Sequence, residues 1–121
     1  MKEVLRRHHI SFKNAFAGFF WSLRTQPNFK VHFFLAIAAV ILGFYLHITR
    51  IEMIIIVFTI ILGLTAEMIN TSLESMTDLI TKEWHQEAKI AKDVSAGMML
   101  VVSFGAVIVA LLIFLPYLRQ L

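Results

Sequence analysis

Acidic and amide side chains recur at helical spacing in one stretch of this 121-residue chain. The stretch holds Glu67, Asn70, Thr71, Glu74 and Asp78, at positions i, i+3, i+4, i+7 and i+11. On a helix, which turns about 100° per residue, these five side chains lie within an arc of roughly 100°. We call them the polar stripe. Its carboxylates suit two kinds of chemistry, since one can bind a hard cation such as Mg²⁺ and another can act as a general base toward an alcohol.

A structural role is the alternative interpretation of the polar stripe. Small polar residues within membrane helices often hydrogen-bond to neighbouring helices, and that role would suit Asn70, Thr71 and Ser72 taken singly. It suits Glu67 and Glu74 less well, because ionisable groups at membrane depth are costly and usually mark a functional site. We therefore expect the stripe to face the interior of a bundle or a wet cavity.

The composition indicates that these side chains belong to a membrane protein. Hydrophobic residues make up 59% of the chain and charged residues 16%, against roughly 45–50% and about 25% in an average soluble domain. A chain this short cannot bury so much apolar surface against itself. The lack of cysteine excludes a disulfide framework, a CxxC metal site and a thiol nucleophile. We expect a single integral-membrane domain over residues 1–121.

Three long apolar stretches predict the elements that position the stripe. They cover about residues 31–48, 53–74 and 94–118. The first of them, as a helix, would span about 27 Å, close to the roughly 30 Å of the hydrocarbon core of a bilayer. Because each backbone must satisfy its own hydrogen bonds within lipid, these lengths fit helices rather than tilted strands. The predicted fold class is an all-α membrane protein with three transmembrane helices.

A further helix is predicted before the first span, over about residues 10–24. Its large apolar residues follow helical spacing and alternate with polar ones, which is typical of an amphipathic helix lying in the headgroup region. These residues are Phe12, Phe16, Phe19, Phe20 and Leu23. The alternative is a helix that simply packs on the bundle. Residues 25–28, which read TQPN, predict a turn between this helix and the first span.

The basic residues predict the orientation of the spans. With a cytoplasmic N-terminus, most Lys and Arg residues lie inside and only Arg50 and Arg119 lie outside, as the positive-inside rule requires. The inner set is Lys2, Arg6, Arg7, Lys13, Arg24, Lys30, Lys82, Lys89 and Lys92. This bias indicates anchoring at the cytoplasmic membrane surface rather than nucleic-acid binding. The polar stripe and the charged loop after it, about residues 79–91, would then lie at the cytoplasmic side.

A lysine near the start of the third span adds a positive charge at the level of the stripe. Lys92 and Asp93 are followed by the small residues Ser95, Ala96 and Gly97. Such a lysine could stabilise the charge that develops on a transferring phosphoryl group. The alternative is a lysine that snorkels to the interface beside a helix-starting aspartate. The chain has no GxGxxG, GxxxxGK[ST] or GxSxG motif, which excludes soluble nucleotide-binding folds as the source of phosphate chemistry.

Residues 67–78, which read EMINTSLESMTD, are similar to the signature of the prokaryotic diacylglycerol kinase family. The sequence Ala91-Lys92-Asp93, followed by small residues, resembles the second marker of that family. The resemblance covers nearly the whole chain. It implies a lipid kinase of the bacterial cell membrane that uses ATP and Mg²⁺. It also implies a homotrimer whose active sites lie at the cytoplasmic surface and are shared between neighbouring subunits.

The resemblance also implies roles for individual residues. Glu67 matches the general base that acts on the lipid hydroxyl, and Glu74 matches a carboxylate that binds both metal and ATP. Asn70 and Asp78 match polar residues that support the site. The remaining matches to nucleotide contacts are Arg7, Asn14, Glu83, Trp84, His85, Lys92 and Asp93. The matches to lipid contacts are Glu67, Asn70 and Ala96.

One position departs from the family pattern. Gln26 stands where the family usually has a second metal-binding glutamate. An amide can still offer its carbonyl oxygen to Mg²⁺, but it lacks the charge that attracts the cation.

The segment Asn28-Phe29-Lys30-Val31-His32 resembles Gram-positive members of the family, many of which act on undecaprenol. We therefore expect undecaprenol as the substrate, with diacylglycerol as the alternative. A proton-coupled transporter with Glu67 as its membrane-embedded site belongs to a different class. The extension of the stripe toward a charged loop favours the kinase. A non-catalytic relative of the kinases is a third hypothesis, and Gln26 is its only hint.

Overall fold

The computed structural model describes residues 1–120, and their side chains except at positions 2, 3 and 5. This part of the chain is helical, without a strand, and its helices are α1 (Lys2–Thr25), α2 (Pro27–Tyr45), α3 (Arg50–Ile80) and α4 (Gln86–Leu118). Within the same residues, α2, α3 and α4 are long and apolar enough to cross a membrane. The predicted all-α class is confirmed, with three helices suited to span a membrane.

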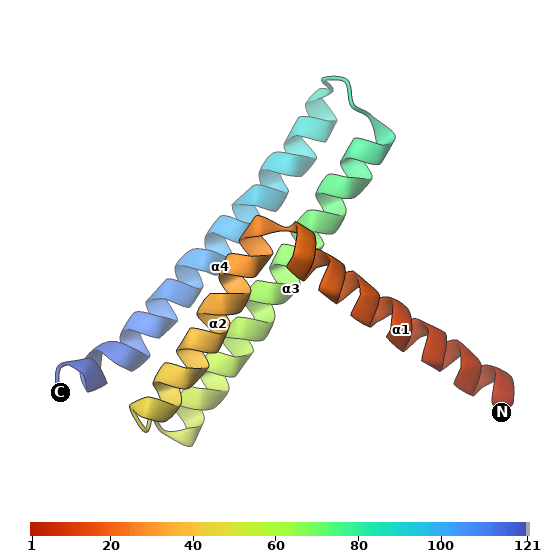
Figure 1. The fold of residues 1–121 in the computed structure, drawn as a ribbon. Coiled ribbons are helices and arrows are strands. Elements are labelled where there is room, and N and C mark those ends of the chain that lie inside the picture. Colours follow the sequence, from red (N-terminus) through yellow and green to blue (C-terminus); the bar gives the residue numbers. More distant parts are fainter. Residues whose placement is uncertain (121) are drawn as a thin grey trace.

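The helices α3 and α4 form a long antiparallel hairpin (Figure 1). The helix α2 packs against α3 along the part of the hairpin that lies away from the α3–α4 loop. The helix α1 leaves the bundle at the start of α2 and extends sideways, so that its N-terminal part stands away from the other three helices. The loop end of the hairpin projects beyond α2.

Three of the described helices are longer than the sequence predicted. The helix α2 instead covers 27–45 rather than the predicted 31–48, and it ends three residues early because the chain turns at residues 46–47, where His47 has a positive φ of 52°. The helix α3 continues past its predicted span to Ile80, α4 begins at Gln86 rather than near residue 94, and α1 exceeds the predicted 10–24 at both ends. No Gly or Pro interrupts these extensions, so the helices propagate into polar sequence. The loop predicted over residues 79–91 is correspondingly shorter and covers 81–85.

The junction of α1 and α2 is a break of one residue rather than the predicted turn over residues 25–28. Gln26 alone is extended, with φ −96° and ψ 112°, and Pro27 takes the first helical position that its fixed φ favours. Phe29 is completely buried beneath this junction, and its ring meets that of Phe19 edge to face at 5.4 Å between centroids. These rings connect α1 to α2.

A hydrogen-bonded cluster joins the two helix ends farthest from the α3–α4 loop. Thr49 and Glu52 form a capping box at the start of α3, in which Oγ1 of Thr49 accepts from the Glu52 backbone N–H at 3.3 Å. The hydroxyl of Tyr117, near the end of α4, donates to Oε2 of Glu52 at 2.7 Å. This contact fixes the register of α4 along α3. It therefore determines which residues of the two helices face each other at the opposite end.

Only a small core is buried within the chain, and most large apolar side chains are exposed. The buried cluster comprises Leu46, Ile56, Ile113 and Phe114. Exposed apolar surface on α2, α3 and α4 is what a bilayer requires, because lipid tails are as apolar as the side chains that face them.

Replacing Phe29 by Ala should destabilise the protein far more than replacing Phe34, an exposed residue of the same helix. The first change empties a fully buried site, which costs about 3–5 kcal/mol for a phenylalanine, whereas Phe34 is 66% exposed. Thermal unfolding of both variants in the same detergent measures the difference. Equal losses in the two variants would contradict the packing described for the α1–α2 junction.

Candidate active site

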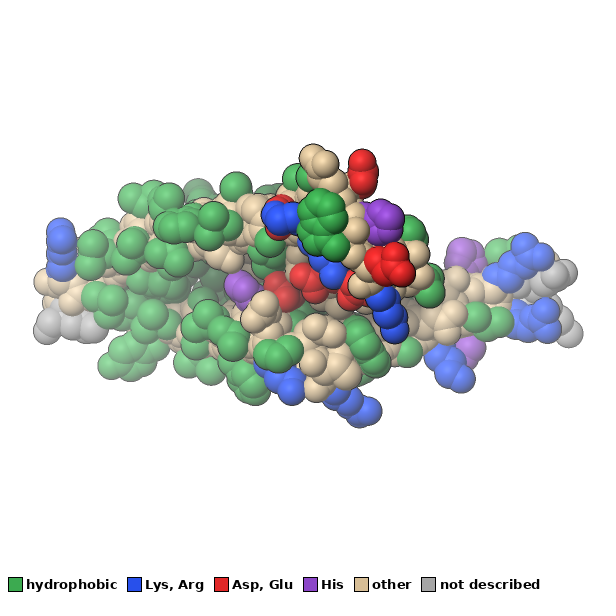
Figure 2. All heavy atoms as spheres, turned by 90° about the horizontal axis from the view of Figure 1, so that it is seen from above, with side chains coloured by type: hydrophobic (Ala, Val, Ile, Leu, Met, Phe, Trp, Pro, Cys, Tyr) green, Lys and Arg blue, Asp and Glu red, His purple; other side chains and the backbone are tan. Residues whose placement is uncertain are grey.

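The polar stripe runs along α3 from the middle of the bundle to its loop end. Its first three residues, Glu67, Asn70 and Thr71, are buried, with 3%, 8% and 8% of their surface exposed. Glu74 and Asp78 follow on the same face and are exposed. Seen from the loop end, acidic and basic side chains gather in the centre of the molecule, beside a largely apolar surface (Figure 2). The predicted stripe therefore faces inward where it is deepest and reaches the surface near the loop.

Two cross-helix contacts show that α4 faces the stripe. Oγ of Ser95 donates to Oδ1 of Asn70 at 2.6 Å, and both residues are buried. Nearer the loop, Nζ of Lys92 donates to Oδ1 of Asp78 at 2.5 Å. The prediction that Lys92 lies level with the stripe is confirmed, although it lies inside α4 rather than at the start of the helix.

Glu67 is the deepest charged group of the stripe. No described side chain is hydrogen-bonded to its carboxylate, and the groups that act on it electrostatically are His32 of α2 and Glu74. Among the described residues no fully buried side-chain oxygen lacks a hydrogen-bond partner, so the unpaired carboxylate oxygens of Glu67 are not completely enclosed. A bound molecule can therefore reach this carboxylate and give up a proton to it.

Asn70 links the deep and the shallow part of the stripe. Its Nδ2 donates to Oε1 of Glu74 at 3.3 Å, while its Oδ1 accepts from Ser95. The amide thus holds a carboxylate that stands at the surface and can reach a cation.

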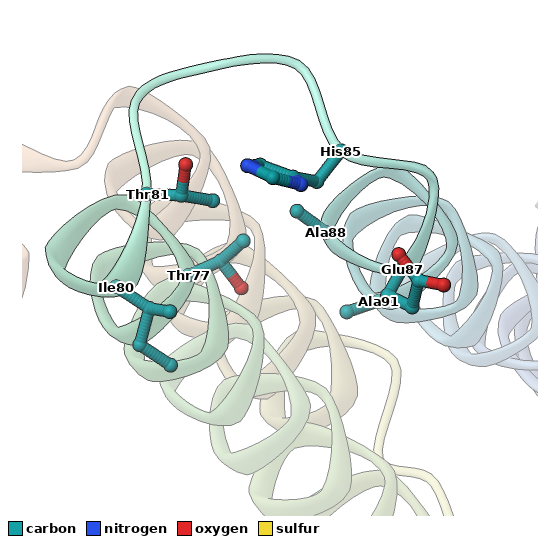
Figure 3. A pocket seen from close by; sticks show the side chains of 7 residues that line it. All are labelled: Thr77, Ile80, Thr81, His85, Glu87, Ala88 and Ala91. Atoms are coloured by element: carbon teal, nitrogen blue, oxygen red, sulfur yellow. The ribbon is translucent and has the colours of Figure 1, made fainter.

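A pocket of about 470 Å³ opens between the loop ends of α3 and α4 (Figure 3). It is lined by Thr77, Ile80, Thr81, His85, Glu87, Ala88 and Ala91. The imidazole of His85 points across the pocket toward Thr81, whereas the carboxylate of Glu87 turns away from it. Of the three predicted loop contacts, His85 lines the pocket, while Glu83 and Trp84 are exposed on the loop and are not among its lining residues.

Several predicted site residues are not brought to the stripe within one chain. Arg7 and Asn14 lie on α1, whose N-terminal part stands away from the bundle. The Gln26 side chain donates to Thr25 at 3.4 Å and is not hydrogen-bonded to Glu74. Asp93 pairs with Lys89, one turn before it on α4. Ala96 is exposed on the same helix.

The oxygen ligands of the stripe fit Mg²⁺. Among the described residues no three His, Cys, Asp or Glu side chains gather to enclose a metal ion. Mg²⁺ does not need such a cage, because it is usually held by one or two carboxylates together with substrate phosphates. Glu74 is an accessible carboxylate, and Asp78 supplies another one turn away.

Two residues that act on the stripe had no role in the predictions from sequence: Ser95, which hydrogen-bonds to Asn70, and His32, which interacts electrostatically with Glu67. Ser95 was one of several small residues after Lys92, and His32 carried only the resemblance to Gram-positive relatives. The available signal for Ser95 was its spacing, since it follows Lys92 by three residues and so shares its face of α4.

The sequence was compared with known proteins. Residues 13–114 match the family model described as prokaryotic diacylglycerol kinase. The chain belongs to this family. It is 42% identical to an undecaprenol kinase of Bacillus subtilis, over 95% of this chain and 94% of that protein. It is also 38% identical to a diacylglycerol kinase of Synechocystis sp., over 93% of this chain but only 65% of that longer relative.

Membership of the prokaryotic diacylglycerol kinase family confirms the lipid kinase expected from residues 67–78 and 91–93. A more distant relative, a diacylglycerol kinase of Haemophilus influenzae, is 30% identical over 69% of this chain and 70% of its own. The names of these relatives favour a kinase over the transporter considered from the sequence.

Replacing Glu67 by Gln should leave the melting temperature unchanged or raise it. The substitution removes a charge from a largely buried residue whose carboxylate accepts no hydrogen bond from a described side chain, and it keeps the shape of the side chain. Thermal unfolding in detergent tests this, with Glu87→Gln on the exposed surface of α4 as the control. A marked fall in the melting temperature for Glu67→Gln alone would show that the carboxylate stabilises the fold.

Proposed function

We propose that this lipid kinase transfers the γ-phosphoryl group of ATP to the hydroxyl of undecaprenol, at the cytoplasmic surface of a bacterial cell membrane. The observation that carries the proposal is Glu67, a largely buried residue whose carboxylate accepts no hydrogen bond from a described side chain, with Asn70 and Glu74 continuing the stripe toward the surface. The Bacillus subtilis relative, which the chain matches over nearly its full length, supports undecaprenol as the lipid.

Glu67 is the proposed general base. Its carboxylate accepts the proton of the lipid hydroxyl as the hydroxyl oxygen attacks the γ-phosphorus of ATP. The bond between that phosphorus and the bridging oxygen of ADP breaks, so the products are the lipid phosphate and ADP. The depth of Glu67 suits an alcohol whose tail lies in the bilayer, while the exposed part of the stripe suits the polar nucleotide. Asn70 and Ala96 are the further lipid contacts in this proposal.

Glu74 is the proposed metal-binding residue, with Asp78 beside it and the Gln26 carbonyl as a neutral substitute for a second carboxylate. When bound there, Mg²⁺ would neutralise part of the charge on the ATP phosphates. Asn70 would keep the Glu74 carboxylate in one orientation through the hydrogen bond from its Nδ2.

The proposed nucleotide site extends from Lys92 to the pocket under the loop. Lys92 and Asp93 would contact the phosphates, and His85, which points into the pocket, would contact the rest of the nucleotide together with Glu83 and Trp84. Lys92 already binds a carboxylate oxygen at 2.5 Å, so its ammonium group is directed at the place where negative charge gathers.

A homotrimer would complete the site. Arg7 and Asn14 belong to α1, which extends away from its own bundle, and the loop end of the α3–α4 hairpin is not covered by α2. In the proposed assembly, α1 of one subunit supplies these residues to the stripe of its neighbour. The exposed apolar residues Phe12, Phe16 and Phe20 support a position of α1 in the headgroup region.

Diacylglycerol is the second candidate substrate, because two of the relatives described above are named diacylglycerol kinase. Both lipids present a primary hydroxyl at the interface and an apolar tail in the bilayer. The choice between them is tested by a kinase assay on each lipid in turn.

Replacing Glu67 by Gln should reduce phosphate transfer to undecaprenol by at least about 100-fold, because general bases contribute roughly 10²–10⁴-fold. The assay follows the γ-phosphate of labelled ATP into extracted lipid, with purified protein, Mg²⁺ and either undecaprenol or diacylglycerol. Ser103→Ala, on the apolar part of α4, serves as the control. No transfer by the unmodified protein to either lipid would refute the proposed function, and faster transfer to diacylglycerol would replace undecaprenol as the substrate.

Replacing Lys92 by Met should lower kcat more than it raises KM for ATP, because the proposed role of the ammonium group is to stabilise charge in the transition state. Steady-state kinetics with undecaprenol measure both constants. Lys82→Met, which removes an exposed loop lysine, should change neither. A rise in KM for ATP without a change in kcat would limit Lys92 to ground-state binding.

A further inference from the structure

We infer that Ser95 is a positioning residue for the metal-binding carboxylate, and that it acts on Glu74 through Asn70. The inference rests on the proposed function, because it assigns Ser95 a part in holding Mg²⁺ at Glu74. The observation is a continuous hydrogen-bonded chain from α4 to the surface of α3. Ser95 donates to Oδ1 of Asn70 at 2.6 Å, and Nδ2 of Asn70 donates to Oε1 of Glu74 at 3.3 Å.

The hydroxyl of Ser95 behaves unlike other hydroxyls in the helices of this chain. Six of those bond the carbonyl oxygen four residues before them on their own helix, which is the usual arrangement for Ser and Thr within helices. They belong to Ser11, Ser22, Thr25, Thr59, Ser72 and Thr77. Ser95 instead crosses to another helix, and it is among the most buried polar residues, with 2% of its surface exposed.

The Ser95 hydroxyl is matched to one orientation of the Asn70 amide. With Oδ1 toward Ser95, the amide directs its N–H groups at the negatively charged Glu74. The reversed amide would place Oδ1 against the carboxylate, where two acceptors repel. Because Asn70 is itself buried, losing the donor on Ser95 would leave Oδ1 without a partner, and buried polar groups without partners are unfavourable. The amide would then turn to find another partner and release Glu74.

A second contact places Glu74 between two cross-helix links. Asn70 lies one turn before Glu74 and is bound to Ser95, while Asp78 lies one turn after it and is bound to Lys92. The two links hold α4 against the face of α3 from which Glu74 projects. Of the two, only the link through Ser95 continues by a hydrogen bond to the Glu74 carboxylate itself.

Mg²⁺ makes such positioning useful. It demands nearly ideal octahedral geometry, so a carboxylate that is free to rotate binds it less well. Residues that hydrogen-bond to a metal ligand and so orient it typically change the metal affinity by 10–100-fold. Gln26 supplies no charge at the second metal position proposed above, so metal affinity depends more heavily on the orientation of Glu74.

The test measures Mn²⁺, a paramagnetic substitute for Mg²⁺, by its electron paramagnetic resonance signal. Detergent-solubilised full-length protein is titrated with Mn²⁺ in the presence of a non-hydrolysable ATP analogue. Ser95→Ala should weaken Mn²⁺ binding about 10-fold, and it should raise the KM for Mg²⁺ in the kinase assay more than it lowers kcat. The control is Ser103→Ala, a half-buried serine of the same helix with no hydrogen bond to another helix among the described residues; it should bind Mn²⁺ like the unmodified protein.

Two further variants decide whether Ser95 acts through Asn70. Asn70→Ala should weaken Mn²⁺ binding, and adding Ser95→Ala to it should weaken binding no further, since residues of one network are not additive. Ser95→Thr keeps the hydroxyl, and its affinity for Mn²⁺ should lie within about threefold of that of the unmodified protein. This variant tests the role of the hydroxyl even where Ser95→Ala folds poorly. Additive losses in the double variant, or a loss in Ser95→Thr as large as in Ser95→Ala, would overturn the inference.

The outcomes separate this inference from the proposed function. Unchanged Mn²⁺ binding in Ser95→Ala, with an active unmodified enzyme, would refute the role of Ser95 and leave the kinase intact. No Mn²⁺ binding and no phosphate transfer by the unmodified protein would instead refute the proposed function, and the inference with it.

Discussion

A charged side chain within a membrane bundle is unfavourable unless protein surrounds it, and this constraint organises the chain. Glu67 is only 3% exposed, because α4 packs along the face of α3 that carries the stripe. The helix α2 also brings His32 within electrostatic range of Glu67. The stripe then becomes more polar and more exposed toward the loop. In the proposed function, this gradient lets one helix face present a largely buried base to a lipid and an exposed carboxylate to a nucleotide.

The α3–α4 hairpin is fixed at both ends by polar contacts, and the apolar residues between them make a small core. Tyr117 and Glu52 join the helices at one end, and Ser95 with Asn70 and Lys92 with Asp78 join them toward the other. Polar links between membrane helices are individually modest, but they set register where apolar packing against lipid does not. The site therefore depends on register rather than on a large core, and α1, attached through one junction, extends away from the hairpin.

The sequence predicted the number and type of the helices, because apolar stretches of bilayer length can form few structures other than membrane-spanning helices. It predicted the face of α3 that matters, because helical periodicity is independent of tertiary contacts. It did not predict helix ends, because α1, α3 and α4 continue into polar segments that contain nothing to stop a helix, whereas α2 ends at Tyr45, inside its apolar stretch. The role of Ser95 and the position of α1 away from the stripe depend on packing between helices, which spacing within one helix cannot reveal. The lipid was predicted only through the resemblance of residues 28–32 to Gram-positive relatives, because both candidate lipids offer the same hydroxyl.

Local oxidative cleavage tests most directly whether metal and phosphates gather at the polar stripe. Fe²⁺ in place of Mg²⁺, with an ATP analogue, ascorbate and peroxide, produces radicals that cut the backbone close to the metal, and mass spectrometry maps the cuts. Our account predicts cuts around Glu74 in α3 and around Lys92 in α4, both suppressed by excess Mg²⁺. Cuts confined to other parts of the chain, or cuts that excess Mg²⁺ does not suppress, would contradict it.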